Sequence, residues 1–401
     1  MPKSLAIIGA GASGLLAAIV ASRRGVKVRI FEKNNKIGKK ILATGNGRCN
    51  ITNQTIKTQN YHGLNPKFVN IAIDRFNTST CRAFFQKLGI EMIEGQKGRL
   101  YPKSLHSSSV VNLLVYECER LGVEFFLDTL VESISTDTDG FALHVEGKIY
   151  HSSSVLIATG GLAMPTLGAS RSGYEFAKSF GHSITPTFAS LVQLECDENL
   201  RDINGVKIQG NIEVLSDKRV VISAQGDILF TNYGLSGSAI LDVSREVGKL
   251  LQNRDEVGIS IDLFSEYSRE QLKNILSKRA KNSNGKTLSL WLDGFINPKL
   301  AKFLAKNIDI KNADNLNSKD LVRLAYMLKN LKFKAISTRG FKSAEVTAGG
   351  VNTDEINPKT FESKLQRGLY FSGEVLDIDA DCGGYNLHWA WASGYSVGMS
   401  I

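Results

Sequence analysis

The first βαβ unit that the sequence predicts constrains the fold more than any other segment. Residues 5–32 read LAIIGAGASGLLAAIVASRRGVKVRIFE: an apolar strand, a G-x-G-x-x-G turn, a helix, and a second strand that ends in an acidic residue. Gly9 allows the tight turn, Gly11 lets the backbone approach a pyrophosphate, and Gly14 lets the helix pack against the sheet. The motif alone is a weak signal, but here strand, helix and acid stand at the spacing of a dinucleotide-binding unit. We therefore expect an α/β fold with a Rossmann-like domain.

Glu32, at the end of the second strand, narrows the choice of ligand. Its carboxylate can accept hydrogen bonds from both hydroxyls of a ribose and repels a 2′-phosphate, which favours the adenosine of FAD or NAD over that of NADP. Helix amides from about Ser13 onward point at the anion. The cofactor-binding residues predicted in this unit are Gly9, Gly11, Ala12, Ser13, Gly14, Glu32 and Lys33. The competing interpretation is a glycine-rich βα turn of another α/β protein.

The same segment also imitates a secretory signal peptide, because Lys3 is followed by a mostly apolar run to Ala21. We reject this interpretation because the run contains the three motif glycines and ends at Ser22 to Gly25 without a convincing cleavage site. No other stretch approaches the roughly 18 apolar residues that a bilayer span needs. We expect a protein without a membrane span, located in the cytoplasm.

Composition agrees with a globular α/β enzyme. The chain has 401 residues, of which 42% are hydrophobic, enough for two or three domains with a sizeable core. The five cysteines are odd in number and scattered, and no two form a C-x-x-C pair. The sequence therefore predicts neither a disulfide framework nor a metal site, and reduced thiols fit best.

The net charge of +10 is concentrated in one segment. Residues 265–342 hold 17 Lys and Arg against 6 Asp and Glu, so this segment accounts for all of the excess positive charge. One interpretation is a surface for nucleic acid, an anionic membrane or an acidic substrate. The other, which we favour, is the solvated lysine-rich face of a small helical domain.

The pattern of apolar residues changes along the chain. In the first half we expect helices at 74–88 and 108–121, a strand at 123–127, a β-meander at 131–135, 141–146 and 148–151, and a buried strand at 155–158. The last of these strands ends at Thr159, Gly160 and Gly161, a second place where backbone can lie close to a cofactor.

The second half predicts an insertion. We expect strands at 191–195, 206–215, 220–223, 228–231 and 257–261 with a helix at 238–251, then mainly helices, then strands at 345–351 and 368–377 and a last helix. The strand-rich part is typical of a small barrel or sandwich. We therefore divide the chain into a discontinuous cofactor domain, 1–189 and 343–401; a β-barrel-like domain, 190–264 with about 332–342; and a helical domain, 265–331.

The C-terminal segment favours FAD over NAD alone. A strand at 369–372 delivers Gly373 and Glu374 to the ribityl or pyrophosphate region, and a helix that opens near Gly384 directs its amides at the flavin pyrimidine. The positive potential of a helix N-terminus stabilises negative charge on the reduced ring and so assists hydride acceptance.

Several motifs together resemble the BaiN/YhiN-type FAD-dependent oxidoreductases, of the glutathione-reductase-like flavoprotein class. The motifs are GAGASG at 9–14, KIGKKILATGNGRCNITN at 36–53, VLIATGG at 155–161, YGLSGSAIL at 233–241, VTAGGV at 346–351, and GLYFSGEVLD with GGYNLHWAWASG at 368–394. The resemblance covers nearly the whole chain, and it implies an FAD domain with an inserted β-barrel and a helical domain.

The resemblance also implies further cofactor contacts. These are Lys40, Thr44, Gly45, Asn46 and Gly47 along the flavin or its ribityl chain, followed by Thr159, Gly160, Gly161, Gly373, Glu374, Gly384, Tyr385, Asn386 and Leu387. The catalytic residues stay unknown, with three candidates. Cys49 is either a redox partner of the flavin or a packing residue. Arg48 either anchors an anion or holds its own loop. His388, where the family usually has Gln, is either an acid or base near the ring or a core histidine.

The reaction expected is flavin redox chemistry, because no Ser-His-Asp order, H-E-x-x-H motif or P-loop is present. FAD would take a hydride from NAD(P)H, acting as a transient donor, or from an organic donor, and pass electrons to an unidentified small-molecule substrate or to dioxygen. The alternatives are a flavin-dependent tRNA-modifying enzyme and a non-enzymatic flavin-containing nucleic-acid-binding protein. Salt-dependent retention of RNA separates these alternatives from a small-molecule enzyme. The oligomeric state is left open.

Overall fold

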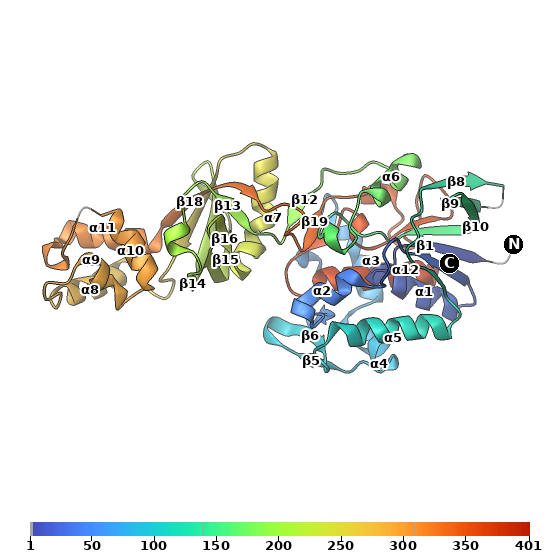
Figure 1. Cartoon of the computed structure of the whole chain (residues 1–401), viewed down its shortest axis with the longest axis horizontal. Helices are drawn as coiled ribbons and strands as arrows, with labels where there is room; N and C mark the ends of the chain where they lie inside the picture. The colour runs from blue at the N-terminus through green and yellow to red at the C-terminus, as the bar shows by residue number, and fades with distance from the viewer. Residues whose placement is uncertain (1–2, 139, 309) are drawn as a thin grey trace. The chain divides into compact units, whose positions relative to one another are not determined.

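The computed structural model describes residues 3–138, 140–308 and 310–401. The chain forms two compact units (Figure 1). Unit 1 comprises the residues up to Phe188 together with Glu345–Ile401, and unit 2 comprises Ala189–Ala344. No helix in the described part of the chain is long and apolar enough to cross a membrane.

Unit 1 is built on a parallel sheet in the order β20-β11-β1-β2-β7. Its strands are β1 (Ser4–Ile8), β2 (Lys27–Phe31), β7 (Glu124–Phe126), β11 (Ser154–Ile157) and β20 (Leu369–Phe371). β1 lies in the middle because its apolar run is buried between two neighbouring strands, as parallel sheets require. β20 comes from the C-terminal part of the sequence and pairs with β11, so both ends of the chain build this sheet.

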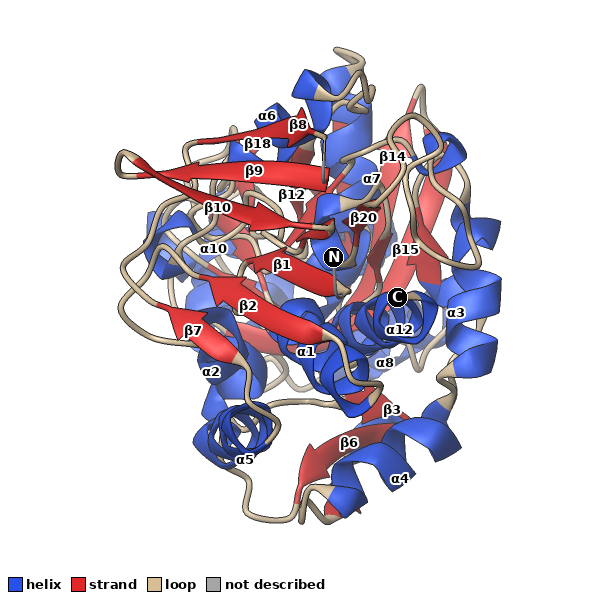
Figure 2. Cartoon of the chain, turned by 90° about the vertical axis from the view of Figure 1, so that its right-hand side faces the viewer, coloured by secondary structure: helices blue, strands red, loops and turns tan. Residues whose placement is uncertain are grey.

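Helices cover one side of this sheet and a smaller sheet covers the other (Figure 2). The helices of unit 1 are α1 (Ala12–Arg23), α2 (Lys39–Gly47), α3 (Asn70–Arg75), α4 (Thr78–Lys87), α5 (Ser107–Arg120), α6 (Ser172–Ser179) and α12 (Tyr385–Ser400). α1 and α12 cross closely, since a Cβ added at Gly394 would lie 2.3 Å from the Ser13 carbonyl oxygen. The predicted meander is confirmed as the antiparallel sheet of β8 (Ser133–Asp137), β9 (Gly140–Val145) and β10 (Lys148–Ser152).

Short strands complete unit 1. They are β3 (Thr52–Asn53), β5 (Met92–Glu94) and β6 (Arg99–Pro102), in the order β3-β6-β5; the pair β4 (Tyr61–His62) and β21 (Asp379–Ala380); and β19 (Val346–Ala348). The chain passes into unit 2 within β12 (Phe188–Ser190).

Unit 2 contains a closed antiparallel barrel in the order β13-β16-β15-β14-β17-β18. Its strands are β13 (Leu194–Cys196), β14 (Lys207–Ser216), β15 (Arg219–Phe230), β16 (Gly234–Ser236), β17 (Val257–Asp262) and β18 (Leu331–Thr338). Its helices are α7 (Ser238–Gln252), α8 (Arg269–Ala280), α9 (Leu288–Asp293), α10 (Pro298–Lys306) and α11 (Ser318–Lys329). One hydrophobic core extends from barrel residues such as Phe230 to helical residues such as Trp291 and Leu324. The predicted fold class, a Rossmann-type domain with a barrel and helices, is confirmed.

Four predicted elements, one helix and three strands, were wrong in detail. The helix expected at 74–88 is two helices, because the Asn77 side chain accepts a hydrogen bond from the Thr80 amide (3.0 Å) and starts α4 anew. The strands expected at 220–223 and 228–231 are one strand, β15, whose polar middle stays paired with β14. The strand expected at 191–195 begins only at Leu194.

Candidate functional site

The turn between β1 and α1 contains two glycines that have no room for a side chain and one that has room. A Cβ at Gly9 (φ 110°) would lie 2.5 Å from the Ala158 carbonyl oxygen, and a Cβ at Gly14 would lie 2.1 Å from the Gly9 carbonyl oxygen. Gly11 has φ −86°, and a Cβ there would meet no atom within 4 Å. The fold therefore needs glycine at positions 9 and 14. Gly11 instead borders open space at the N-terminus of α1, where the first N–H groups of a helix have no partner within the helix. Such a cradle fits the pyrophosphate of FAD.

Glu32 is buried, with 8% of its surface exposed, and it ties the end of β2 to the glycine turn. Its Oε2 accepts a hydrogen bond from the Ala10 amide (2.8 Å), and its Oε1 accepts from the amide (2.9 Å) and side chain (2.6 Å) of Asn34. Oε1 thus accepts two hydrogen bonds, whereas Oε2 accepts one and keeps a second acceptor site for a ribose hydroxyl. Burial lowers the pKa of the neighbouring Lys33, an effect that the Glu32 charge opposes.

The C-terminal part of α2 departs from helical geometry and forms, with the residues that follow, a loop with left-handed backbone. Gly45 has φ 58° and the non-glycine residues Asn46 and Cys49 have φ 55° and 58°. The Cys49 amide closes the loop by donating to the Thr44 carbonyl oxygen (3.0 Å). A Cβ at Gly47 would meet nothing within 4 Å. At Gly47 the loop therefore leaves its backbone open to an approaching group, as expected for a segment along a flavin.

An ion pair joins this region to the C-terminal half of the cofactor domain. Lys40 Nζ lies 2.6 Å from Glu374 Oε2, and Glu374 Oε1 accepts from the Thr347 amide (2.9 Å). The Thr347 hydroxyl in turn accepts from the Leu162 amide (2.8 Å). A Cβ at Gly161 would lie within 2.9 Å of both Thr347 and Glu374 side chains. Four segments far apart in the sequence thus meet where the sequence predicted cofactor contacts.

The exit of β20 packs against both terminal helices. The Gly373 amide donates to Ser393 Oγ (2.9 Å), and the Trp389 indole donates to the Gly373 carbonyl oxygen (3.1 Å). A Cβ at Gly373 would lie 2.8 Å from Ser13 Oγ. Gly373 therefore lies at the first turn of α1, next to the glycine motif.

The predicted cofactor contacts at the start of α12 differ in their surroundings. Gly384 (φ 96°) lies against the Thr52 carbonyl oxygen, which a Cβ would approach to 2.6 Å. The Asn386 side chain binds the amide and carbonyl oxygen of Ala380 (2.9 and 2.8 Å), so its polar atoms hold the chain itself. Tyr385 and Leu387 are half-buried, and burial raises the pKa of Tyr385.

Two of the three catalytic candidates are buried. Cys49 has no exposed surface, and burial raises the pKa of its thiol to about 12, so it stays protonated and unreactive. His388 is also fully buried, its Nδ1 lies 2.7 Å from Thr52 Oγ1, and burial lowers its pKa to about 4. These surroundings favour the packing interpretation for both residues.

Arg48 is exposed and holds its own loop. Its Nε donates to the Gly45 carbonyl oxygen (3.2 Å), and its guanidinium carbon lies 5.2 Å from the centre of the Tyr101 ring. These two contacts support the second of the two interpretations of Arg48, that it holds its own loop.

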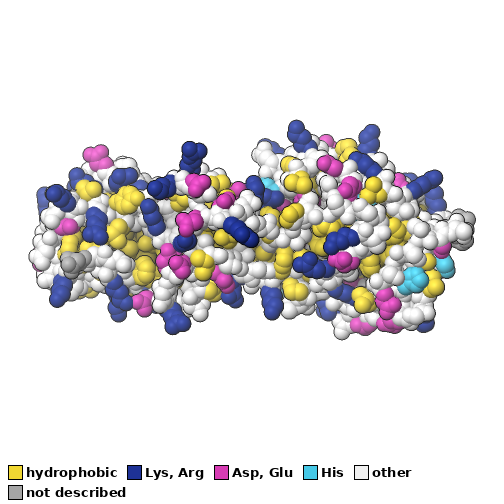
Figure 3. All heavy atoms as spheres, turned by 90° about the horizontal axis from the view of Figure 1, so that it is seen from above, with side chains coloured by type: hydrophobic (Ala, Val, Ile, Leu, Met, Phe, Trp, Pro, Cys, Tyr) yellow, Lys and Arg dark blue, Asp and Glu magenta, His cyan; other side chains and the backbone are white. Residues whose placement is uncertain are grey.

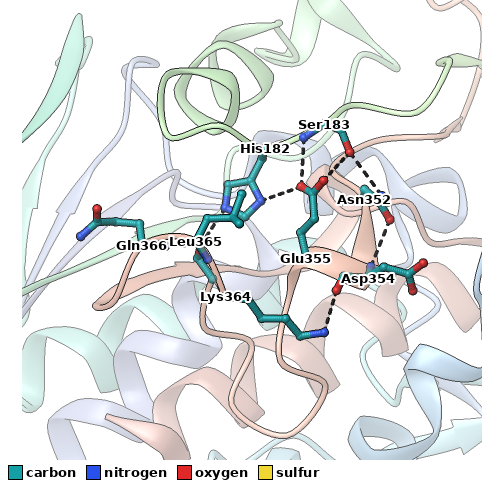
Figure 4. Close-up of polar contacts among 9 residues, drawn as sticks. His182, Ser183, Asn352, Asp354, Glu355, Lys364, Leu365 and Gln366 are labelled. Carbon is teal, nitrogen blue, oxygen red and sulfur yellow. Dashed lines mark hydrogen bonds and ion pairs between the residues drawn. The ribbon is translucent and has the colours of Figure 1, made fainter.

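A histidine, a glutamate and a serine that the sequence analysis missed form a separate polar network (Figure 4). His182 Nδ1 lies 3.0 Å from Glu355 Oε2, and His182 Nε2 lies 2.8 Å from Ser363 Oγ. This geometry resembles a hydrolytic triad, but Ser363 Oγ also accepts hydrogen bonds from the Leu365 and Gln366 amides (3.0 and 2.9 Å). Both acceptor sites of the hydroxyl are therefore filled. The network links the residues after α6 to the 352–366 loop. No sequence motif predicts it.

Comparison with known proteins places the chain in one family. The model of the HI0933-like protein Rossmann domain matches residues 3–400. The chain is 35% identical to a 3-dehydro-bile acid delta(4,6)-reductase of Clostridium scindens, over 99% of this chain and 98% of that protein. It is 34% identical to ribosomal RNA dihydrouridine synthases of Haemophilus influenzae and Escherichia coli, each over 98% of this chain and 97% of the relative. The chain therefore belongs to the HI0933-like family, and it is an FAD-dependent oxidoreductase of the BaiN/YhiN type that its motifs resemble.

Proposed function

We propose that the protein is an FAD-dependent reductase that adds two hydrogen atoms to a carbon–carbon double bond next to a carbonyl group, with NAD(P)H as the electron donor. One observation carries this proposal. Two kinds of relative, similar over their whole length, bear names that describe different substrates but the same chemistry, saturation of a double bond in a bile acid or in uridine. We therefore infer the reaction that both names share, the saturation of a double bond, rather than either substrate.

The residues of unit 1 support this proposal through the contacts that they offer the cofactor. The open backbone at Gly11 suits the pyrophosphate and Glu32 suits the ribose. The Lys40–Glu374 ion pair joins two segments that are predicted to lie along the flavin. When bound, FAD supplies hydride transfer to the substrate carbon.

RNA is a second candidate substrate, and one observation favours it. The segment 265–342, whose described residues belong to unit 2, carries the excess of positive charge, and Figure 3 shows Lys and Arg side chains over the visible face of that unit. A polyanion is attracted to such a surface whether or not its sequence is recognised. RNA would then present a uracil as the double bond to be reduced.

Anaerobic half-reactions test the proposal. The purified protein is mixed with NADH and with NADPH in turn, and bleaching of the flavin absorbance identifies the donor. The reduced protein is then mixed with a 3-oxo-Δ4,6 bile acid, with unmodified ribosomal RNA, or with air. We expect reoxidation by one of the first two, with the product gaining two hydrogen atoms by mass spectrometry. Rapid reoxidation by air alone would instead identify an oxidase.

A further inference from the structure

A histidine–aspartate pair lies beside the approach to α12. His62 Nε2, on β4, lies 2.7 Å from Asp381 Oδ1, and Asn60 Nδ2 donates to Asp381 Oδ2 (3.3 Å). The two side chains are 31% and 43% exposed. Nδ1 of His62 has no hydrogen-bond partner among the described residues. One ring nitrogen is therefore held by a carboxylate while the other is free to exchange a proton.

The position of Asp381 depends on the first turn of α12. The Asn386 side chain donates to the carbonyl oxygens of Ala380 (2.8 Å) and Asp381 (3.3 Å), and the Asp381 amide donates to the Asn60 carbonyl oxygen (3.0 Å). β21 also pairs with β4 in the register Asp379 to His62. The pair is thus fixed to the segment that leads into Gly384, where the sequence predicts the flavin pyrimidine.

Other proton-bearing groups near this segment suit proton donation less well. Burial raises the pKa of Tyr61 and Tyr385, so each phenol holds its proton more tightly than usual. The buried His388 has its pKa lowered to about 4 and stays neutral. His62 differs from these groups because its side chain is partly exposed and one of its ring nitrogens is held by a carboxylate.

We propose that His62, oriented by Asp381, is the proton donor of the reduction. This inference rests on the proposed function. Saturation of the double bond needs a hydride at the carbon β to the carbonyl and a proton at the α carbon. The hydride originates from NAD(P)H, which is oxidised to NAD(P)+, and the electron pair of the double bond takes the proton from Nδ1 of the His62 imidazolium. The neutral imidazole then regains a proton from solvent.

His62→Gln is the decisive variant, because its amide can still donate to Asp381 but cannot supply a proton. The control is His151→Gln, at a second pair in which His151 Nδ1 lies 2.6 Å from Asp137 Oδ2, on the meander of unit 1. Flavin content and bleaching by NAD(P)H are measured first and should match wild type in both variants. We expect reoxidation by the 3-oxo-Δ4,6 bile acid, or by ribosomal RNA, to slow about 10²- to 10³-fold in His62→Gln alone.

Two further readouts distinguish a proton donor from a structural histidine. Added imidazole should restore part of the lost rate in His62→Ala. It should not change the rate of wild type or of His151→Gln. In the FAD-loaded protein, the substrate that reoxidises the flavin should protect His62, but not His151, from carbethoxylation by diethyl pyrocarbonate, mapped by mass spectrometry.

The outcomes separate the two proposals. If wild type reduces either probe and His62→Gln does so at the same rate, the role of His62 is overturned while the proposed function stands. If wild type is bleached by NAD(P)H but neither probe reoxidises it, the proposed function fails and the role of His62 falls with it.

Discussion

Gly11 and Gly14 occupy one turn, yet substitution should affect them in opposite ways. A Cβ at Gly14 collides with the Gly9 carbonyl oxygen, so Gly14→Ala should lower the free energy of unfolding by about 1–3 kcal/mol or more. Gly11 has an ordinary φ and open space, so Gly11→Ala should fold as wild type does. It should nevertheless weaken FAD binding about tenfold or more, because the added methyl group stands where the pyrophosphate approaches.

Urea unfolding of the apoproteins and titration with FAD measure the two effects separately. Unchanged FAD affinity in Gly11→Ala would show that the open space is not the pyrophosphate site. Equal destabilisation of both apoproteins would contradict the steric distinction between these glycines.

The buried His388 should make stability depend on pH. Burial lowers its pKa from the usual 6.5 to about 4, so between these values the unfolded chain binds a proton that the folded protein does not. The free energy of unfolding therefore falls as the pH falls through this range, by about 3 kcal/mol at pH 4 from this residue. Urea unfolding of wild type and His388→Gln at pH 7 and pH 4.5 tests this. Wild type should lose more stability than the variant, and parallel losses would contradict it.

Residue types alone were enough to predict the glycines and Glu32 as cofactor contacts, because each has a fixed offset from a strand or helix end. They did not identify the surroundings that decide reactivity. Cys49 and His388 looked chemically capable, and only the packing around them shows that both are buried. The pairs Lys40–Glu374 and His62–Asp381 join residues more than 300 positions apart, which no local pattern can reveal.

The crossing of α1 and α12 links the stability of the cofactor domain to its glycine turn. Gly394 brings α12 onto the Ser13 carbonyl oxygen, so Gly394→Ala must push the helices apart. Alanine gains about 1 kcal/mol of helix propensity over glycine, but contact with a backbone atom at 2.3 Å outweighs this gain. We expect a net loss of stability together with weaker FAD binding. Met399→Ala, at a 38% exposed position of the same helix, should leave both unchanged. Thermal unfolding with and without FAD tests the pair, and a stable Gly394→Ala protein would show that the helices can separate freely.

Elements with a strong period were predicted well, and those decided by local polar groups were not. The alternation of 141–146 and the continuous apolar run of 155–158 correspond to β9 and β11 within about one residue. The break between α3 and α4 depends on one asparagine side chain, whose cap competes with helix continuation. Within β15, Gln225, Gly226 and Asp227 resemble a turn, but pairing with β14 overrides that local preference.

For the protein as a whole, the uneven charge yields a test that separates an RNA substrate from a small molecule. Lys281, Lys302 and Lys319 are exposed residues of unit 2, and Lys57, Lys67 and Lys87 are exposed residues of unit 1. Replacing either set by Gln changes the net charge equally. If unit 2 binds RNA, the first triple variant should weaken retention of ribosomal RNA and flatten the slope of log affinity against log salt, by about 0.7 to 0.9 for each lost phosphate contact. The second triple variant should change neither. Equal effects of the two triple variants would mean that the net charge of the protein alone attracts RNA. If wild type does not retain ribosomal RNA at moderate salt, a small molecule similar to a bile acid is the better candidate substrate.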